Sequence, residues 1–132
     1  MLIETSKIIK ANHLKNGEFN RVDVVVRAMY IDAKITNKPD IKAYRNLYCK
    51  MQRKRLRSLR KKSCKKLIRK FDRLIESVQT HGLGRGKFAK LKFFVCLGRN
   101  LTLSDGSHRL AVAIALGLDT VPVSFKASHR FC

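Results

Sequence analysis

Positive charge is concentrated in one part of this sequence, and that concentration limits how the chain can fold there. Lys and Arg occupy thirteen of the twenty-four positions from Lys50 to Arg73. Each pair of like charges at neighbouring helical positions costs about 0.2–0.5 kcal/mol, so a helix here must bury an apolar side and leave its cations in water. Apolar residues do recur at helical spacing, at Ile41, Tyr44, Tyr48, Met51, Leu59, Leu67, Phe71, Leu74, Ile75 and Val78.

The apolar spacing divides this region into two helices. A turn at Asn37 to Asp40 precedes the first, and the stripe restarts at Leu67, which predicts a break or bend near Lys61 to Cys64. Gly82 stands where the second helix would end, because glycine is common just past a helix C-terminus. The sequence therefore predicts a basic helical segment over about residues 40–80.

The charge of the whole chain favours an anionic partner. Thirty Lys and Arg residues against nine Asp and Glu give a net charge of +21. Repulsion among these cations destabilises the folded chain unless anions bind to it. We expect DNA or RNA to bind through Lys50 to Arg73, with a solvated basic face as the alternative. Charge alone does not show whether the partner is nucleic acid, a nucleotide or an acidic membrane. The aromatic residues Tyr44, Tyr48 and Phe71 lie on the apolar stripe and are not obvious stacking platforms.

Length and apolar pattern predict one folded domain over residues 1–132. A chain of 132 residues can bury roughly two thirds of its unfolded surface. Glu4, Lys7 and Lys10 argue against a signal peptide, and the longest uncharged apolar run, Leu110 to Leu118, is about half of what a bilayer requires. The four cysteines form no CxxC pair, so we expect reduced thiols in a cytoplasmic protein. The oligomeric state is not specified.

Two regions outside the basic segment predict strands. β-Branched and aromatic residues predict a strand over Arg21 to Ile31, with Asp23 paired to Arg27 on one face. Lys87 to Leu97 alternates as another strand, and Gly98 to Asn100 turn it into a short partner strand, LTLS. The sequence therefore predicts a hairpin immediately before Asp105.

A last helix and strand complete the pattern. Leu110, Ile114 and several alanines predict a closely packed helix, and Gly117 closes it. The strand VPVSF follows, and Pro122 suggests that it lies at a sheet edge. The expected fold class is α+β, a small mixed sheet with a long basic helical insertion.

The turn that opens this helix gathers groups that bind phosphate. The first amides of a helix lack partners within it, and the helix dipole places partial positive charge at the same end. Gly106 would let a ligand approach the backbone, Ser107 offers a hydroxyl, and His108 offers an imidazole donor. Arg109 adds a forked cation that suits two phosphate oxygens. A capped helix start with solvated side chains is the structural alternative.

Asp105 is the awkward member of this turn, because a carboxylate repels a neighbouring phosphate. Three roles would resolve the conflict. It caps the helix by accepting the N2 or N3 amide, it holds a Mg²⁺ that bridges to phosphate, or it accepts a proton from an attacking hydroxyl. The residues alone leave all three roles open.

The segment DGSHRLAVAIALGLDTVPV resembles the signature of the ParB/sulfiredoxin-like superfamily, in which a short G-x-[HR]-R turn opens a helix before a glycine and a Val-Pro strand. Upstream, FDRLIESVQTHGL resembles the helix and glycine that precede the central strand. The resemblance covers about Phe71 to Phe125 and implies a ParB/sulfiredoxin-like fold that binds ATP, ADP or CTP. The residues that it implies for phosphate contacts are Gly106, Ser107, His108, Arg109 and Arg27.

Departures from the superfamily's pattern narrow the implied activity. Sulfiredoxins carry a catalytic cysteine where this chain has Ser107, so sulfinic acid reduction is not expected. ParB partition proteins add a helix-turn-helix domain, which we do not expect after Phe125, so chromosome partition is not expected either. The Asp-Gly-x-His-Arg form is closest to the free serine kinases, which implies catalysis by Asp105, His108 and Arg109. Asp105 would organise Mg²⁺ or proton transfer, and Arg109 would steady the transferring phosphoryl group.

A second carboxylate would help as a base. The candidates are Glu4 and Asp23, because Glu76 lies on a helix whose neighbours suggest a surface position. For Asp23 we favour the alternative role, pairing with Arg27.

Two functions are therefore expected as alternatives. The first is a nucleotide-phosphate-binding protein that acts as an ATP- or ADP-dependent phosphotransferase or as an NTPase. The second is a nucleic-acid-binding protein or nuclease that uses the basic helical face. A structural module with a vestigial phosphate site is a third interpretation.

Overall fold

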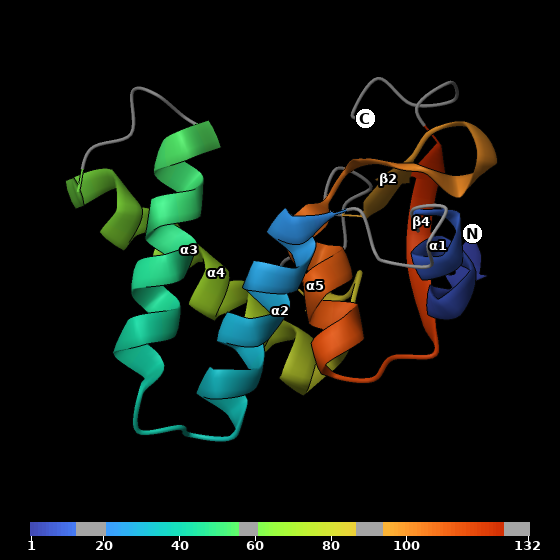
Figure 1. Cartoon of the computed structure of the whole chain (residues 1–132). Helices are drawn as coiled ribbons and strands as arrows, with labels where there is room; N and C mark the ends of the chain where they lie inside the picture. Colours follow the sequence, from blue (N-terminus) through green and yellow to red (C-terminus); the bar gives the residue numbers. More distant parts are fainter. Residues whose placement is uncertain (13–20, 56–60, 87–93, 126–132) are drawn as a thin grey trace.

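The computed structural model describes residues 1–12, 21–55, 61–86 and 94–125 of the chain. Within these ranges it shows helices packed with one small mixed sheet (Figure 1), which confirms the expected α+β class. The elements, in chain order, are β1 (Leu2–Glu4), α1 (Thr5–Ala11), α2 (Val22–Ile35), α3 (Ile41–Arg55), α4 (Lys61–His81), β2 (Val95–Leu97), the 3-10 helix η3 (Arg99–Leu101), β3 (Leu103–Asp105), α5 (Ser107–Ala115) and β4 (Thr120–Phe125). None of the helices so described is long and apolar enough to cross a membrane.

The described strands lie in the order β1-β4-β2-β3, with β2 and β4 parallel and the other pairs antiparallel. The predicted hairpin of β2 and β3 is confirmed, although residues 87–93 of the predicted strand lie outside the described ranges. The expected edge position of VPVSF is wrong, because β4 lies between β1 and β2. Pairing with β2 begins at Val123, so Pro122, which has no amide hydrogen to donate, precedes that ladder.

The largest difference from the sequence-based expectation is that the region from Arg21 to Ile31 is helical and belongs to α2. The strand propensity of β-branched residues depends on packing context, and here packing against α5 and α3 favours a helix. Val24 and Ile31, seven residues apart, are fully buried on the side that faces the core. The predicted pairing of Asp23 with Arg27 is confirmed, but it spans one helical turn, with 2.9 Å between Asp23 Oδ2 and Arg27 Nη1.

The two basic helices form as the apolar spacing predicts. The predicted break or bend at Lys61 to Cys64 is wrong at those residues, because they form the first turn of α4. Residues 56–60, between α3 and α4, lie outside the described ranges. The predicted stop after α4 is confirmed. Helix α4 ends at His81, and Gly82 follows with a φ of 87°, its amide donating to the Val78 carbonyl over 2.9 Å.

Helix α5 lies at the centre of the core. Leu110, Ala111, Val112 and Ala113 are fully buried, and the small alanines let neighbouring elements approach closely. Figure 1 shows α5 between α2 and the sheet, with α3 on the other side of α2. The first turn of α5 therefore begins where the sheet meets the helices.

A disulfide joins the two basic helices. Cys49 of α3 and Cys64 of α4 are bonded, with their Cα atoms 5.9 Å apart, and Cys96 is also disulfide-bonded. The expectation of reduced cysteines is therefore wrong for these residues, and the described part of the chain has no free cysteine. The reason is geometric, because residues fifteen apart in sequence meet where α3 and α4 pack.

Removing this bridge should destabilise the protein. A disulfide with a sequence separation of 15 is expected to contribute about 3 kcal/mol, mainly by restricting the unfolded chain. We predict that the Cys49→Ala/Cys64→Ala variant loses free energy of unfolding of this order in urea titrations without reductant. Reductant should then destabilise the variant less than it destabilises the wild type. Equal stability of the two proteins would contradict the prediction.

Candidate phosphate-binding site

The turn before α5 depends on a glycine. Gly106 is the N-cap residue of α5 and has a φ of 88°, a conformation that residues with a Cβ rarely adopt. A Cβ at this position would lie 3.0 Å from the Cα of Val95 and 3.2 Å from the carbonyl oxygen of Phe94. Gly106 is therefore needed for the close approach to β2. This packing role differs from the expected one, in which its small size lets a ligand approach.

Asp105 does not cap the helix. Its Oδ1 accepts a hydrogen bond from the Gly106 amide over 2.7 Å, and α5 has no hydrogen bond from an N-cap side chain. The Asp105 side chain is exposed at the end of β3. Of the three roles open at the sequence level, the capping role does not describe this geometry.

Ser107 and Arg109 lie half-buried in the first turn of α5. Burial lowers the pKa of the Arg109 guanidinium, and the nearby negative charge of Asp105 opposes this effect. The guanidinium remains a cation, because arginine does not lose its proton at neutral pH. This end of α5 therefore combines a poorly hydrated positive charge, a hydroxyl and the positive end of the helix dipole.

His108 points into the molecule. Its Nε2 atom lies 2.8 Å from the hydroxyl of Tyr48 and accepts a hydrogen bond from Arg27 Nε over 3.2 Å. A guanidinium can only donate, so Nε2 must be the acceptor and the imidazole proton belongs on Nδ1. The ring also stands edge-on to Phe71, with 4.8 Å between centroids. In this arrangement Nε2 cannot donate to a phosphate. The sequence predicts an imidazole donor here, and Nε2 does not fill that role.

Arg27 reaches the turn, but through His108. Its side chain is 1% exposed, and its three nitrogens donate separately to His108, to Asp23 over 2.9 Å and to Gln52 over 3.0 Å. A guanidinium held in this way orients its neighbours and has little freedom to contact a ligand. We therefore treat Arg27 as a positioning residue for His108 and not as a phosphate ligand.

Of the two candidates for a second carboxylate, one lies at the far edge of the sheet from Asp105 and the other is held by two arginines. Glu4 lies in β1, at the opposite edge of the sheet from β3. Asp23 pairs with Arg21 and Arg27, each over 2.9 Å. Burial alone would raise the pKa of Asp23, but these two cations and their hydrogen bonds outweigh it and lower the pKa to about 2. A carboxylate with so low a pKa is a poor general base at neutral pH.

Sequence reasoning missed two members of this polar network. Tyr48 and Gln52 lie one turn apart on α3, are buried, and are joined by a hydrogen bond of 3.3 Å. The sequence pattern places Tyr48 on the apolar stripe alone. The available signal was Gln52, because an amide one helical turn after a buried aromatic residue needs a polar partner.

The donor set at the turn fits Mg²⁺ only together with a phosphate. Magnesium is commonly held by one or two carboxylates plus substrate phosphate oxygens and water. Asp105 supplies one carboxylate, and its Oδ1 already accepts the Gly106 amide. Among the described residues no cluster of three or more His, Cys, Asp or Glu could hold a metal by itself.

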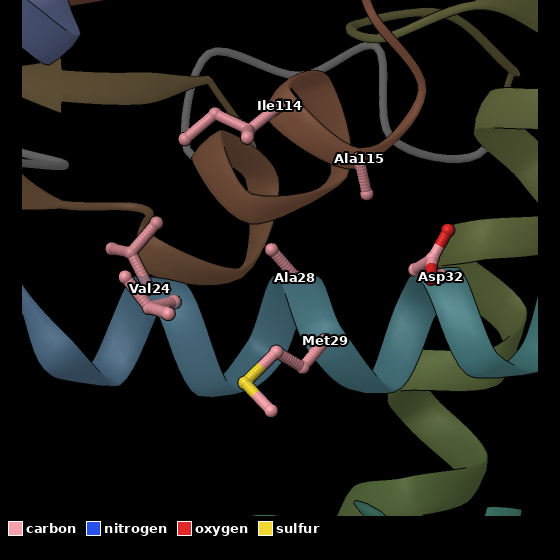
Figure 2. Close-up of a pocket in the computed structure, with 7 residues that line it drawn as sticks. Val24, Ala28, Met29, Asp32, Ile114 and Ala115 are labelled. Carbon is pink, nitrogen blue, oxygen red and sulfur yellow. The ribbon is translucent and has the colours of Figure 1, made fainter.

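A groove between α2 and α5 lies away from this turn (Figure 2). Its volume is about 370 Å³, and on α5 it is lined near the end of the helix that is opposite Ser107. Asp32 is the one charged residue among those that line it, so the groove offers no cation to a phosphate. The lining residues are Val24, Val25, Ala28, Met29, Asp32, Ile114 and Ala115.

Comparison of the chain with known protein families, with curated proteins and with solved structures found no match. The resemblance to the ParB/sulfiredoxin-like superfamily therefore depends on the residues of the Asp105 turn and their surroundings alone.

The Asp23 ion pairs should make stability depend on pH. The pKa of Asp23 is about 2 in the folded protein and 3.8 for the free side chain, so its contribution is present above the unfolded pKa and disappears as pH falls through the folded one. The contribution is about 1–2 kcal/mol, allowing for solvent screening. We predict that Asp23→Asn is destabilised at pH 7, and that its difference from the wild type in urea unfolding shrinks from about pH 5 to about pH 2.

Asp119→Asn is the matched control, because Asp119 is exposed and its side chain has no partner among the described residues. Its difference from the wild type should stay constant over the same pH range. A constant difference for Asp23→Asn would show that the ion pairs do not stabilise the fold.

Proposed function

We propose that the first turn of α5 binds the phosphate of a nucleotide, ATP, ADP or CTP. The observation that carries the proposal is that Gly106 opens α5 in a left-handed conformation while Ser107 and Arg109 lie half-buried beside that start. The positive end of the helix dipole favours an anion at this position. Arg109 would donate to two phosphate oxygens, and Ser107 would add its hydroxyl.

The same geometry supports a specific division of roles. Asp105 is exposed next to the turn, where it would hold a Mg²⁺ that bridges to the phosphate or accept a proton from an attacking hydroxyl. His108 would keep the turn in place through Arg27 and Tyr48. Phosphoryl transfer or NTP hydrolysis would therefore depend on Asp105 and Arg109, with His108 in a positioning role.

Nucleotide binding should disappear with the Arg109 guanidinium. Ligand at 100 times its Kd stabilises a folded protein by about 2.7 kcal/mol, which thermal denaturation detects readily. We predict that Arg109→Ala loses the stabilisation by ATP, ADP or CTP that the wild type shows. Arg99→Ala, which removes an exposed arginine outside the turn, should keep it. Retention of the stabilisation by Arg109→Ala would overturn the proposal.

Asp105→Asn separates the metal role from simple repulsion. Without Mg²⁺ the variant should bind nucleotide more tightly than the wild type, because a negative charge next to the phosphate has been removed. With Mg²⁺ the wild type should gain affinity and the variant should gain little. Isothermal titration calorimetry with and without the metal measures both effects. An equal gain from Mg²⁺ in both proteins would exclude Asp105 as the metal ligand.

A further inference from the structure

Helices α3 and α4 carry a set of exposed cations that we call the basic face. Each of its residues is exposed, and within the described ranges none forms an ion pair with Asp or Glu. Its members are Lys50, Arg53 and Lys54 on α3 and Lys65, Lys66, Arg69, Lys70 and Arg73 on α4.

The few acidic residues of these helices are turned away from the basic face. The sequence from Ile41 to His81 contains only two acids, Asp72 and Glu76. Both pair with Lys34 of α2, over 3.1 Å for Asp72 and 3.5 Å for Glu76. Asp72 also accepts a hydrogen bond from the hydroxyl of Tyr30 over 2.7 Å. The two acids therefore compensate the charge of Lys34 on α2. Within the described structure, the basic face has no acidic side chain paired with it.

On α4 the cations share one side of the helix. The five cations from Lys65 to Arg73 recur three or four residues apart, which places them in neighbouring rows of one helical surface. They extend over about 12 Å at the rise of an α-helix, roughly 1.5 Å per residue. The other side is apolar and buried, through Phe71, Leu74 and Ile75.

The disulfide holds the segment of α3 that carries Lys50 next to the segment of α4 that carries Lys65. Lys50 directly follows Cys49, and Lys65 directly follows Cys64. Because the Cα atoms of the two cysteines are 5.9 Å apart, the chain segments that carry these lysines are held together covalently. The repulsion between the helices is therefore opposed by a bond and not by acidic side chains.

We propose that the basic face binds the phosphate backbone of a nucleic-acid duplex without regard to sequence. A linear array of exposed cations matches a linear array of phosphates, and such contacts supply affinity without reading bases. A bilayer surface fits less well, because interfacial helices insert an apolar side and that side of α4 is buried in the core. The duplex interpretation does not depend on nucleotide binding at α5.

A duplex also fits better than a single strand. Single-stranded nucleic acid is usually held by exposed aromatic rings on which bases stack. Tyr48 and Phe71 are 0% and 2% exposed and pack against each other with 5.4 Å between centroids. Tyr44 is half-buried, with the ammonium of Lys38 over its ring. The aromatic residues of these helices are therefore not available for stacking.

The basic face and the α5 turn lie on different sides of α4. Phe71, on the buried side, contacts the ring of His108, whereas the cations from Lys65 to Arg73 are exposed. Substitutions at one site can therefore be made without touching the other. This separation allows the two proposals to fail independently.

The test measures binding of the full chain to a fluorescent 20-base-pair duplex by anisotropy at several salt concentrations. The variant replaces Lys65, Lys66, Arg69 and Lys70 by Gln. We expect its affinity to fall by more than about tenfold at low salt, and its slope of log K against log[salt] to become shallower by about 3–4, since each duplex phosphate contact contributes about 0.9.

The matched control makes the same change of charge elsewhere. It replaces by Gln four exposed cations outside α3 and α4, and these are Lys7, Lys10, Arg85 and Arg99. The control should keep the wild-type slope, and circular dichroism should show that both variants are folded. An equal change of slope in both variants would overturn the proposal, because it would show that only the net charge matters.

Three further arms decide among other partners. Tighter binding to a single strand of the same length would overturn the duplex assignment. Binding to vesicles of anionic lipid, lost in the Lys65/Lys66/Arg69/Lys70 variant and without duplex binding by the wild type, would show a membrane surface instead. Arg109→Ala should bind the duplex like the wild type, and a loss there would place the duplex at the α5 turn.

Discussion

The buried guanidinium of Arg27 is the interaction on which the arrangement of the helices depends. A charge in a protein interior is costly unless it is paired and fully hydrogen-bonded. Here each nitrogen has a different acceptor, supplied by Asp23 one turn earlier on α2, by Gln52 on α3 and by His108 on α5. Because the three acceptors come from three helices, a shift of any one of them leaves part of the guanidinium unsatisfied. The network therefore fixes the position of the first turn of α5 relative to α2 and α3.

The parts of the fold that could be predicted are those with local signals. The hairpin that ends at Asp105, the buried helix after it and the glycine that ends α4 are each encoded by a few adjacent residues. The strand predicted over Arg21 to Ile31 was wrong, because the valines there satisfy the pattern of a strand. Only contacts with α5 and α3 make a helix more stable in this region. The disulfide and the interior position of β4 likewise depend on segments that meet only after folding.

The candidate site shows the same division. The grouping of Asp105, Gly106, Ser107 and Arg109 at the start of a helix could be predicted from their order in the sequence. The inward orientation of His108 could not, because its partners Arg27 and Tyr48 lie 81 and 60 residues away in the chain. The strand predicted over Arg21 to Ile31 kept the pairing of Asp23 with Arg27, but it did not show that Arg27 also meets Gln52 and His108. The wrong secondary structure therefore concealed the network around the turn.

The bond between Cys49 and Cys64 has a consequence for recognition as well as for folding. Gathering like charges on one surface is unfavourable, and a flexible chain would have to meet that cost each time it associates with a partner. In the oxidised protein the two cationic helices are already adjacent, so the cost is included in the folded state. The surface is in this sense preorganised, and association would lose less free energy to rearrangement than it would in a chain whose helices were free to separate.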